Sequence, residues 1–394
     1  MILDSLLKKI LKKGNLVWIK PNGLDFKYGD STGTPIKMRT TNDFSEIKMM
    51  MNPSLHFGES YMNGSLILEE GTIHDLLKLI FVNSRSNDDH WVMKVDKIIR
   101  AIRNRIVSSN YIPKSKKNVA HHYDLSDKLY DLFLDKDRQY SCAYFNSPND
   151  TLEQAQLNKK ELIAKKLLLE EGQSVLDIGS GWGGMASYLS KRSNVNVKGV
   201  TLSEEQIAYS QQRKIDESLD KVEYALQDYR KVEESFDRIV SVGMFEHVGT
   251  PHYQEFFNKI YKLLNEKGVA LIHTIGRIDQ PTTNDPWIEK YIFPGGYIPA
   301  LSEVMQRIEK SGLTTTDIQV LKFHYAETLK RWRYNFYDNI DKVREFYDDK
   351  FCRMWDFYLS SSQASFEEST LVIYQLQLSK DKKTVPDSRD YMLV

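Results

Sequence analysis

The sequence contains very little cysteine and no long hydrophobic run. Among its 394 residues only Cys142 and Cys352 are cysteines, which excludes a disulfide framework and favours a reduced, cytoplasmic setting. No segment approaches the roughly 18 consecutive apolar residues of a membrane-spanning helix. The amino terminus, interrupted by Asp4, Lys8 and Lys9, does not have the pattern of a signal peptide. The protein is therefore predicted to be soluble or peripheral to a membrane.

The chain as a whole also lacks an excess of charge of either sign. Its formal net charge is zero, which identifies no partner. Between Lys94 and Lys117, however, eight basic residues stand against a single acid, which gives this segment a net charge of +7. Such a segment is usually a solvated surface, but it also suits an anionic lipid surface at about 1 kcal/mol per basic residue. Nucleic acid is the less favoured partner because no recognition motif accompanies the charge.

The chain length predicts two or three domains. Residues 1–110 are predicted to form a separate module that begins with a short basic amphipathic helix over residues 1–11. The apolar face of this helix either packs within the module or contacts a membrane surface. In the same module, residues 58–64 have the composition of a turn around an aromatic residue, and residues 73–82 predict a helix. Residues 111–160 are predicted to be a helical linker that covers a ligand-binding site in the following residues.

Strands and helices alternate regularly in the remaining residues, 161–394. Strands are predicted from Val175 and over residues 196–202, 222–226, 236–244, 269–274, 313–323 and 371–378, helices over residues 152–169 and 253–264, and a helical, aromatic-rich insertion over residues 328–366. This alternation is typical of an α/β fold with a doubly wound, Rossmann-like parallel sheet and helices on both faces. Gly268 is predicted to end the 253–264 helix. Residues 276–366 are predicted to cover the substrate-binding site of this domain, and residues 276–300 are predicted to be a mobile lid.

The most informative segment, Val175–Gly184, indicates a buried strand, a tight turn and the start of a helix. Gly179, Gly181 and Gly183 have no Cβ, so a ligand can lie against the backbone of the turn. The glycine spacing differs from the dinucleotide fingerprint, and no Lys-Ser or Lys-Thr pair follows to make a phosphate loop. The acid before the glycines, Asp177, suits a ligand with an ammonium group, such as S-adenosylmethionine.

Residues with binding or catalytic chemistry follow the predicted strands. Asp177 follows the first strand and Asp228 with Tyr229 the third, while Glu246 follows the fourth and His273 ends the fifth. The carboxyl ends of strands in a doubly wound sheet share one edge, so these side chains are expected in one crevice. Taken singly they are ambiguous, because Asp228 also suits a helix cap and a lone histidine is more often structural.

The second predicted strand ends without the acid that usually binds ribose hydroxyls. It ends instead at Thr201–Ser203, so hydroxyl groups, backbone or Gln206 would have to contact a ribose. Ser203 and Gln206 are also predicted to form a capping box, in which each side chain bonds the backbone amide of the other residue.

Seven segments carry a family resemblance. They are Tyr140–Phe145, Val175–Gly184, Thr201–Gln206, Gly243–Gly249, His273–Gly276, Tyr325–Leu329 with Trp332, and Gly58–Gly64. Together they resemble the cyclopropane-fatty-acyl-phospholipid synthases, over nearly the whole chain. The combination is specific, whereas the glycine loop alone indicates only a methyltransferase. The resemblance implies that residues 161–394 form a class I methyltransferase domain.

The resemblance also implies a reaction. A methylene would pass from S-adenosylmethionine to the cis double bond of an unsaturated phospholipid acyl chain, through a carbocation that a bound bicarbonate ion deprotonates. The implied bicarbonate ligands are the side chains of Cys142, Glu246, His273 and Tyr325 and the backbone of Ile275. The implied cofactor contacts are Tyr140, Ser141, Val175, Leu176, Asp177, Ile178, Gly179, Ser180, Gly181, Trp182, Gly183, Thr201, Leu202, Ser203, Gln206, Asp228, Tyr229 and Arg230. No metal site is implied.

Aromatic faces stabilise a cation by about 0.5–2 kcal/mol each and keep a pocket dry. The candidates for this role are Tyr140, Tyr144, Phe145, Tyr325, Trp332, Tyr334 and Phe336. About half of them are expected to be ordinary core residues instead.

One family position is altered in this chain. Many family members carry a cysteine shortly after a Tyr-Leu pair in the carboxyl-terminal helix. Here Tyr358-Leu359 is followed by serines, and Ser362 occupies the aligned position. Because every bicarbonate position is intact, we interpret the missing thiol as dispensable.

The predicted partners are an unsaturated phospholipid and the inner face of a membrane, with a homodimer left open. Two other functions stay open. A related enzyme could make a methyl-branched or methylene fatty acid or N-methylate a small amine, and a non-catalytic protein could bind lipid or cofactor. The amino-terminal module and the basic segment favour a lipid over an amine. The intact bicarbonate positions argue against the non-catalytic alternative.

Overall fold

The computed structural model describes residues 2–85 and 126–392. The basic segment 94–117 and the predicted boundary at residue 110 lie outside these ranges. No helix in the described part of the chain is long and apolar enough to cross a membrane. Both cysteines are buried, and neither takes part in a disulfide.

The chain folds into two compact units that interleave along the sequence. The first unit comprises Met1–Ile106, Thr282–Pro294 and Ala326–Thr370, and the second comprises Val107–Pro281, Gly295–Tyr325 and Leu371–Val394. The whole helical insertion, residues 328–366, thus groups with the amino-terminal residues, whereas the sequence pattern assigned it to the 161–394 domain. The predicted boundaries at residues 110 and 160 stay predictions.

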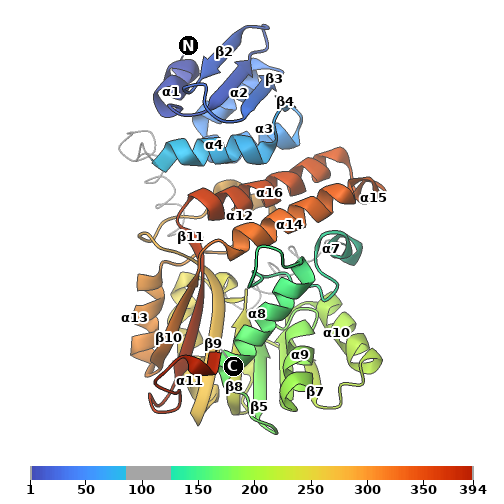
Figure 1. The fold of residues 1–394 in the computed structure, drawn as a ribbon, viewed down its shortest axis with the longest axis vertical. Helices are drawn as coiled ribbons and strands as arrows, with labels where there is room; N and C mark the ends of the chain where they lie inside the picture. Colours follow the sequence, from blue (N-terminus) through green and yellow to red (C-terminus); the bar gives the residue numbers. More distant parts are fainter. Residues whose placement is uncertain (1, 86–125, 393–394) are drawn as a thin grey trace. The chain divides into compact units, whose positions relative to one another are not determined.

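The second unit is built around a seven-stranded sheet with the order β10-β11-β9-β8-β5-β6-β7 (Figure 1). The strands are β5 (Ser174–Ile178), β6 (Asn196–Thr201), β7 (Val222–Leu226), β8 (Phe236–Val242), β9 (Leu264–Arg277), β10 (Thr314–Leu321) and β11 (Leu371–Ser379). The helices are α7 (Asp127–Phe133), α8 (Leu152–Leu167), α9 (Gly184–Ser193), α10 (Glu204–Asp216), α11 (Tyr253–Leu263) and α13 (Leu301–Ser311).

Helices cover both faces of this sheet. One hydrophobic core contains side chains of α8 and α9, and the other contains side chains of α11 and α13. The predicted α/β fold with a doubly wound sheet is confirmed. It places the ends of β5, β6, β7 and β8 along one edge, where the site described below is found.

One strand departs from the predicted parallel sheet. β5 to β9 are parallel, but β11 is antiparallel to both of its neighbours, β9 and β10. The prediction is wrong at this strand. After β10 the chain enters the helical insertion and returns at the same end of the sheet, which reverses the direction of β11. A long insertion in place of a short turn hides such a pairing from the sequence pattern.

The junction between α11 and β9 also differs from the prediction. Gly268 does not end the helix, because α11 ends at Leu263 and β9 begins at the next residue. Leu264 already has an extended backbone, with φ −81° and ψ 132°. Gly268 lies inside β9, where an added Cβ would stand 2.5 Å from Leu264 Cγ. Its role there is close packing within the strand.

The first unit contains a four-stranded sheet with the order β2-β1-β3-β4 and a set of helices. Its strands are β1 (Asn15–Ile19), β2 (Asp25–Tyr28), β3 (Pro35–Thr40) and β4 (Leu66–Glu70). Its helices are α1 (Ile2–Ile10), α2 (Asp43–Met51), α3 (Pro53–Met62), α4 (Ile73–Arg85), α12 (Pro286–Tyr291), α15 (Ile340–Arg344), α16 (Asp349–Glu368) and all but the first two residues of α14 (His324–Asp338). The predicted amino-terminal helix and the 73–82 helix are confirmed.

Residues 58–64 are mostly helical, so the predicted turn is wrong over residues 58–62. Only Asn63 and Gly64 follow α3 as a turn. Gly58 lies inside the helix because a Cβ there would stand 2.6 Å from the Trp287 ring and 2.8 Å from the Phe357 ring. The glycine is required by close packing of α3 against α12 and α16, which the local sequence does not reveal.

Two aromatic residues of the insertion are core residues, as expected for about half of the candidates. Trp332 and Phe336 of α14 are fully buried, while Tyr334 is 50 % exposed. A role of any of them toward a cation stays a prediction.

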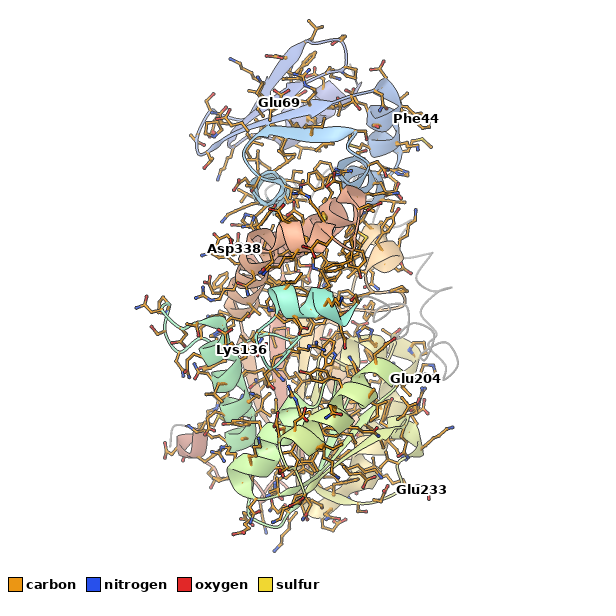
Figure 2. The ribbon with its side chains drawn as sticks, turned by 90° about the vertical axis from the view of Figure 1, so that its right-hand side faces the viewer. Phe44, Glu69, Lys136, Glu204, Glu233 and Asp338 are labelled. Atoms are coloured by element: carbon orange, nitrogen blue, oxygen red, sulfur yellow. The ribbon has the colours of Figure 1, made fainter. Side chains whose placement is uncertain are left out.

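Helix α2 buries a charged side chain and exposes several large apolar ones. Glu46 points inward and accepts hydrogen bonds from Lys20 Nζ at 3.0 Å and Thr40 Oγ1 at 2.7 Å. Phe44, labelled in Figure 2, lies on the outer face. It is 63 % exposed, and Met51 is 79 % exposed. An exposed group of large apolar side chains often marks a surface that contacts another molecule or a membrane.

Candidate functional site

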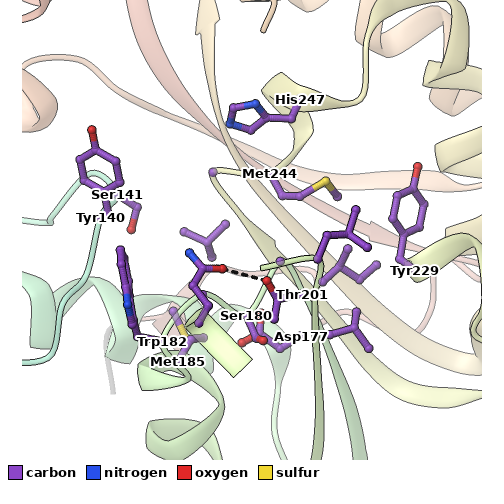
Figure 3. A pocket seen from close by; sticks show the side chains of 18 of the residues that line it. Tyr140, Ser141, Asp177, Ser180, Trp182, Met185, Thr201, Tyr229, Met244 and His247 are labelled. Carbon is purple, nitrogen blue, oxygen red and sulfur yellow. Dashed lines mark hydrogen bonds between the residues drawn. The ribbon is translucent and has the colours of Figure 1, made fainter. Parts of the chain in front are cut away.

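A cavity opens at the carboxyl ends of β5, β6, β7 and β8, entirely within the second unit (Figure 3). It is lined by Arg138, Gln139, Tyr140, Ser141, Asp177, Ile178, Gly179, Ser180, Gly181, Trp182, Met185, Val200, Thr201, Leu202, Gln206, Gln227, Asp228, Tyr229, Arg230, Val242, Gly243, Met244, His247 and Val248. The topology therefore gathers the turns after four strands around one space, which is where ligands bind in sheets of this kind.

Most predicted cofactor residues lie in this lining, and four do not. Val175 and Leu176 are buried in the two hydrophobic cores, and Gly183 and Ser203 are not part of the lining. Several lining residues were not selected from the sequence, namely Arg138, Gln139, Met185, Val200, Gln227, Val242, Gly243, Met244, His247 and Val248. The sequence could have indicated the lining residues between Gly243 and Val248, because they belong to a motif that carries the family resemblance. The cofactor contacts themselves stay predictions.

The glycine loop brings the backbone close to neighbouring groups. Gly179 has φ +80°, and an added Cβ would stand 2.8 Å from Met244 Cβ. Gly181 also has a positive φ of +55°, but a Cβ there would have no atom within 4 Å. Gly179 is thus required by both conformation and packing, whereas Gly181 is required by conformation alone.

Asp177 is the buried acid of this cavity. Its side chain is 2 % exposed, and its Oδ2 has no hydrogen-bond partner among the described residues. Burial raises the pKa of Asp177 to about 7, and the positive charge of Lys159 opposes that rise. Ser180 Oγ is a second buried polar atom of the lining without a described partner. Such atoms favour a polar ligand because leaving them unpaired costs free energy.

The end of β6 offers hydroxyl and amide groups in place of an acid. Thr201 Oγ1 donates a hydrogen bond to Gln206 Oε1 at 2.8 Å (Figure 3). Ser203 Oγ accepts a hydrogen bond from the Gln206 amide at 3.2 Å, so half of the predicted capping box is confirmed. The other half is wrong, because the Ser203 amide donates to Thr201 Oγ1 instead. Gln206 is thereby held in the cavity lining.

Asp228 has the capping role that the sequence left open. Its Oδ1 accepts from the Arg230 amide at 2.9 Å at the start of the short helix Tyr229–Lys231. Arg230 also pairs with the same carboxylate through Nε at 2.9 Å and Nη2 at 2.7 Å. Because Asp228 also lines the cavity, its capping role and a ligand contact are compatible.

A cluster of aromatic rings forms one wall of the cavity. The Tyr130 ring lies 4.8 Å from the Trp182 ring and 5.6 Å from the Tyr140 ring, measured between centroids. Tyr130 belongs to α7 and was not selected from the sequence. Its packing orients two rings that line the cavity.

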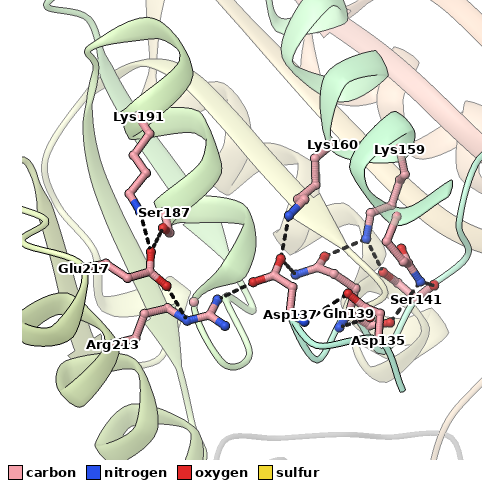
Figure 4. A network of polar contacts seen from close by, with 12 residues as sticks. Asp135, Asp137, Gln139, Ser141, Lys159, Lys160, Ser187, Lys191, Arg213 and Glu217 are labelled. Atoms are coloured by element: carbon pink, nitrogen blue, oxygen red, sulfur yellow. Dashed lines mark hydrogen bonds and ion pairs between the residues drawn. The ribbon is translucent and has the colours of Figure 1, made fainter. Parts of the chain in front are cut away.

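A buried polar network holds the segment Gln139–Ser141 against α8 (Figure 4). Gln156 Nε2 donates to the carbonyl oxygens of Gln139 at 3.1 Å and Ser141 at 3.0 Å. Lys159, one turn later and fully buried, donates to Gln139 Oε1 at 2.6 Å and Ser141 Oγ at 2.9 Å. Burial lowers the pKa of Lys159 to about 8. Gln156 and Lys159 belong to no sequence motif. Their contact with the segment Gln139–Ser141 becomes visible only in the folded structure.

The predicted bicarbonate residues lie outside the lining, although Cys142 and Glu246 directly neighbour the lining residues Ser141 and His247 in the chain. Glu246, on the short helix Phe245–His247, is 7 % exposed and accepts a hydrogen bond from the Ile275 amide to Oε1 at 2.6 Å. Burial raises the pKa of Glu246 to about 7. Its Oε2 has no hydrogen-bond partner among the described residues, whereas hydrogen bonds from the Ile275 amide and the Thr274 side chain to the carboxyl oppose the rise in its pKa.

His273 lies two residues before Ile275 on β9 and is 1 % exposed. Burial lowers the pKa of His273 to about 3, and the positive charges of Lys159 and Lys166 act in the same direction. The ring is therefore neutral at physiological pH. Its Nε2 has no hydrogen-bond partner among the described residues.

Cys142 and Tyr325, the other two predicted bicarbonate side chains, are also buried. Cys142 is 1 % exposed and Tyr325 is 8 % exposed. Their segments meet through His324, whose ring stacks on Tyr144 at 4.6 Å and whose Nδ1 accepts from the Phe145 amide at 3.1 Å. The structure thus joins Glu246 directly to Ile275 and joins the Cys142 segment to the start of α14.

Comparison with known proteins identifies the family to which this chain belongs. Residues 112–376 match the model of the mycolic acid cyclopropane synthetase family. The chain is 35 % identical over 350 residues to the cyclopropane-fatty-acyl-phospholipid synthase of Escherichia coli K12, covering 88 % of each chain. The chain belongs to the cyclopropane synthetase family. It is accordingly an enzyme related to methyltransferases.

Two further relatives are similar to about two thirds of this chain. A probable fatty acid methyltransferase of Pseudomonas putida is 37 % identical over 266 residues, covering 66 % of this chain and 68 % of that protein. The mycolic acid cyclopropane synthase CmaA1, solved with SAH and CTAB, is 33 % identical with a TM-score of 0.63, over 67 % of this chain and 97 % of that one. Residues 3–89 match a family described only as a domain of unknown function.

Proposed function

We propose that this enzyme forms cyclopropane fatty acids in unsaturated phospholipids. A methylene from S-adenosylmethionine would be added across a cis double bond of an acyl chain. Family membership supports S-adenosylmethionine-dependent alkylation of an unsaturated lipid. The observation that carries the finer proposal is a pair of buried polar atoms, Glu246 Oε2 and His273 Nε2, at the same sheet edge as the cavity.

The cavity fits S-adenosylmethionine, which supplies an electrophilic methyl carbon when bound. Asp177 Oδ2 and Ser180 Oγ are buried polar atoms that such a ligand can satisfy. Thr201 and Gln206 offer a hydroxyl and an amide at the end of β6, where a ribose binds in related sheets. Trp182 and Tyr140 provide flat apolar surface beside them.

The buried pair fits bicarbonate, which supplies a base when bound. With its pKa raised to about 7, Glu246 holds a proton on its carboxyl group for part of the time at neutral pH. Oε2 can then donate a hydrogen bond while Oε1 accepts one from the Ile275 amide. A neutral His273 with a proton on Nε2 is a second donor. Two buried donors of this kind are what an anion requires.

The burial of the proposed bicarbonate ligands also supports the proposed chemistry. An alkene is a weak nucleophile, and the cation that it forms is captured by any water within reach. Cys142 and His273 are each 1 % exposed, and Glu246 is 7 % exposed. These side chains exclude water from the place where a proton would be lost. Cys142 acts in this proposal as an anion ligand and not as a nucleophile.

We also propose that the enzyme works attached to the inner face of a membrane. The outward apolar face of α2, with Phe44, Ile47 and Met51 between 53 % and 79 % exposed, supports contact of the amino-terminal module with a lipid surface. The adjacent cation Lys48 lies 4.2 Å from the Phe44 ring centroid and suits a phosphate headgroup. A homodimer stays open.

The product can be tested with S-adenosylmethionine that carries a trideuterated methyl group. The protein is incubated with vesicles of unsaturated phospholipid, and the lipids are examined by mass spectrometry and NMR. We expect a cyclopropane that retains two of the three deuterium atoms. A methyl-branched lipid would retain all three, and a small-amine methyltransferase would leave the lipids unchanged. Either result would refute the proposed reaction.

The proposed base can be tested separately. Turnover is measured in buffer depleted of dissolved carbon dioxide and again after bicarbonate is added, with sodium chloride at equal ionic strength as the control. We expect added bicarbonate, and not chloride, to restore turnover. Equal turnover in both buffers would refute the bicarbonate assignment and leave the identity of the product untouched.

A further inference from the structure

Gln375 and His273 form a buried cross-strand pair. They are register partners in the antiparallel ladder of β11 and β9, so their side chains leave the sheet on the same face. Gln375 is 0 % exposed and His273 is 1 % exposed. Gln375 Nε2 lies 3.1 Å from His273 Nδ1, within hydrogen-bond distance. The side chain of Gln375 therefore contacts one of the two ring nitrogens of His273, namely Nδ1.

The chemistry of the two groups determines which ring nitrogen can carry the proton. A neutral imidazole has one N–H donor and one acceptor nitrogen. In the structure the Gln375 amide turns its NH₂ toward Nδ1 and leaves its Oε1 without a described partner. Because NH₂ is only a donor, this orientation makes Nδ1 the acceptor and leaves the ring proton on Nε2. Nε2 is the buried atom without a described partner. The hydrogen bond that one ring nitrogen makes thus sets the role of the other.

We propose that Gln375 is a positioning residue that holds His273 in the neutral Nε2–H tautomer and so aims an N–H donor at the anion site. This inference rests on the proposed function, because that function places an anion beside Nε2. It assigns His273 a role as a hydrogen-bond donor and not as the base. A carboxylate in place of Gln375 would instead accept from Nδ1–H, which would turn Nε2 into an acceptor that repels an anion.

Gln377 provides a matched comparison on the same strand. It is also 0 % exposed and lies two residues further along β11, on the same face. Its Nε2 donates to the Lys166 carbonyl at 2.6 Å, and its Oε1 accepts from Thr316 Oγ1 at 2.9 Å. These bonds go to other elements and not to His273, so replacing Gln377 removes buried hydrogen bonds without changing the contact at Nδ1.

The tautomer can be measured without turnover, by long-range ¹H–¹⁵N NMR of the full-length protein labelled with ¹⁵N-histidine. The signals of His273 are identified by their loss in the His273→Gln protein. We expect the wild-type ring to show a protonated Nε2 and an unprotonated Nδ1. A protonated Nδ1 in the wild-type protein would overturn the proposal, and this result does not depend on turnover.

Variants then test whether Gln375 is the cause. We expect Gln375→Glu to move the proton to Nδ1 and to lower kcat at least tenfold, with the KM for S-adenosylmethionine within threefold of wild type. Gln377→Met should keep the wild-type tautomer and most of the turnover. An unchanged tautomer in Gln375→Glu would overturn the proposal. The two proposals can fail separately. If the NMR spectra show the expected tautomers but added bicarbonate has no effect on turnover, bicarbonate is not the base, and the positioning role of Gln375 is still supported.

Discussion

Lys159 donates a hydrogen bond to Ser141 from the protein interior, with 2.9 Å between Nζ and Oγ. A fully buried lysine is uncommon, and this one also donates to Gln139 Oε1 at 2.6 Å. The two acceptors lie on either side of Tyr140, which lines the cavity. Lys159 therefore anchors a wall of the cofactor site from behind, without lining the cavity itself.

Lys159→Met is expected to weaken binding of S-adenosylhomocysteine by about tenfold or more. The methionine fills similar space but leaves the oxygen atoms of Gln139 and Ser141 without their buried donor, and a hydrogen bond to a charged group contributes about 1.5–3 kcal/mol. Isothermal titration calorimetry measures the affinity. Lys165→Met, on the same helix but paired at its surface with Glu161, is the control and should bind like wild type. Equal affinities in both variants would contradict the anchoring role.

The raised pKa of Glu246 predicts a pH-dependent effect on stability. Burial raises this pKa from 4.5 to about 7, so the protonated group stabilises the fold below about pH 4.5, and that contribution is lost as the pH rises through 7. Glu246→Gln cannot lose a proton. We expect the free energy of unfolding of this variant, relative to wild type, to rise by roughly 3 kcal/mol between pH 4.5 and pH 8. Urea unfolding at the two pH values measures this, and a difference that does not change with pH would contradict the buried, titrating carboxyl.

Ser362→Ala is expected to retain turnover within about twofold of wild type. Ser362 lies in α16 in the first unit, and its side chain is only half-buried. The proposed anion site is complete without a hydroxyl or thiol at this position. Ser362→Cys, which restores the residue found in many family members, should likewise change turnover little. Loss of all activity in the alanine variant would show that this position takes part in the reaction.

Much of the second unit follows from its sequence because the signals there are local. Strand β7 was predicted with its observed bounds, and the glycine turn was placed correctly, since an apolar run followed by glycines describes a strand and a turn. Asp177 was expected after the first strand but lies inside β5, one residue before its end. The reversed β11 could not be predicted, because its direction depends on a helical insertion that separates it from β10. Lys159 and Gln375 were missed for the same reason, since each gains its role from a contact with a distant segment.

The double substitution of Phe44 and Met51 by serine is expected to reduce vesicle binding by about tenfold or more. Both side chains face outward on α2, and burial of such a side chain in lipid contributes about 1.5–3 kcal/mol. Sedimentation with unsaturated phospholipid vesicles measures the bound fraction. Ile215→Ser removes a side chain of similar exposure, 71 %, from α10 and should have no effect. Unchanged binding in the double variant would exclude this face as the lipid contact.

Cofactor binding and proton removal belong, in the proposed function, to two different groups of residues at one sheet edge. The most direct test compares Glu246→Ala and His273→Ala with wild type, by calorimetry with S-adenosylhomocysteine and by turnover on phospholipid vesicles. Neither residue lines the cavity, so we predict affinities within about threefold of wild type and turnover reduced at least a hundredfold. Loss of cofactor affinity in parallel with turnover, or turnover close to wild type, would contradict this separation of roles.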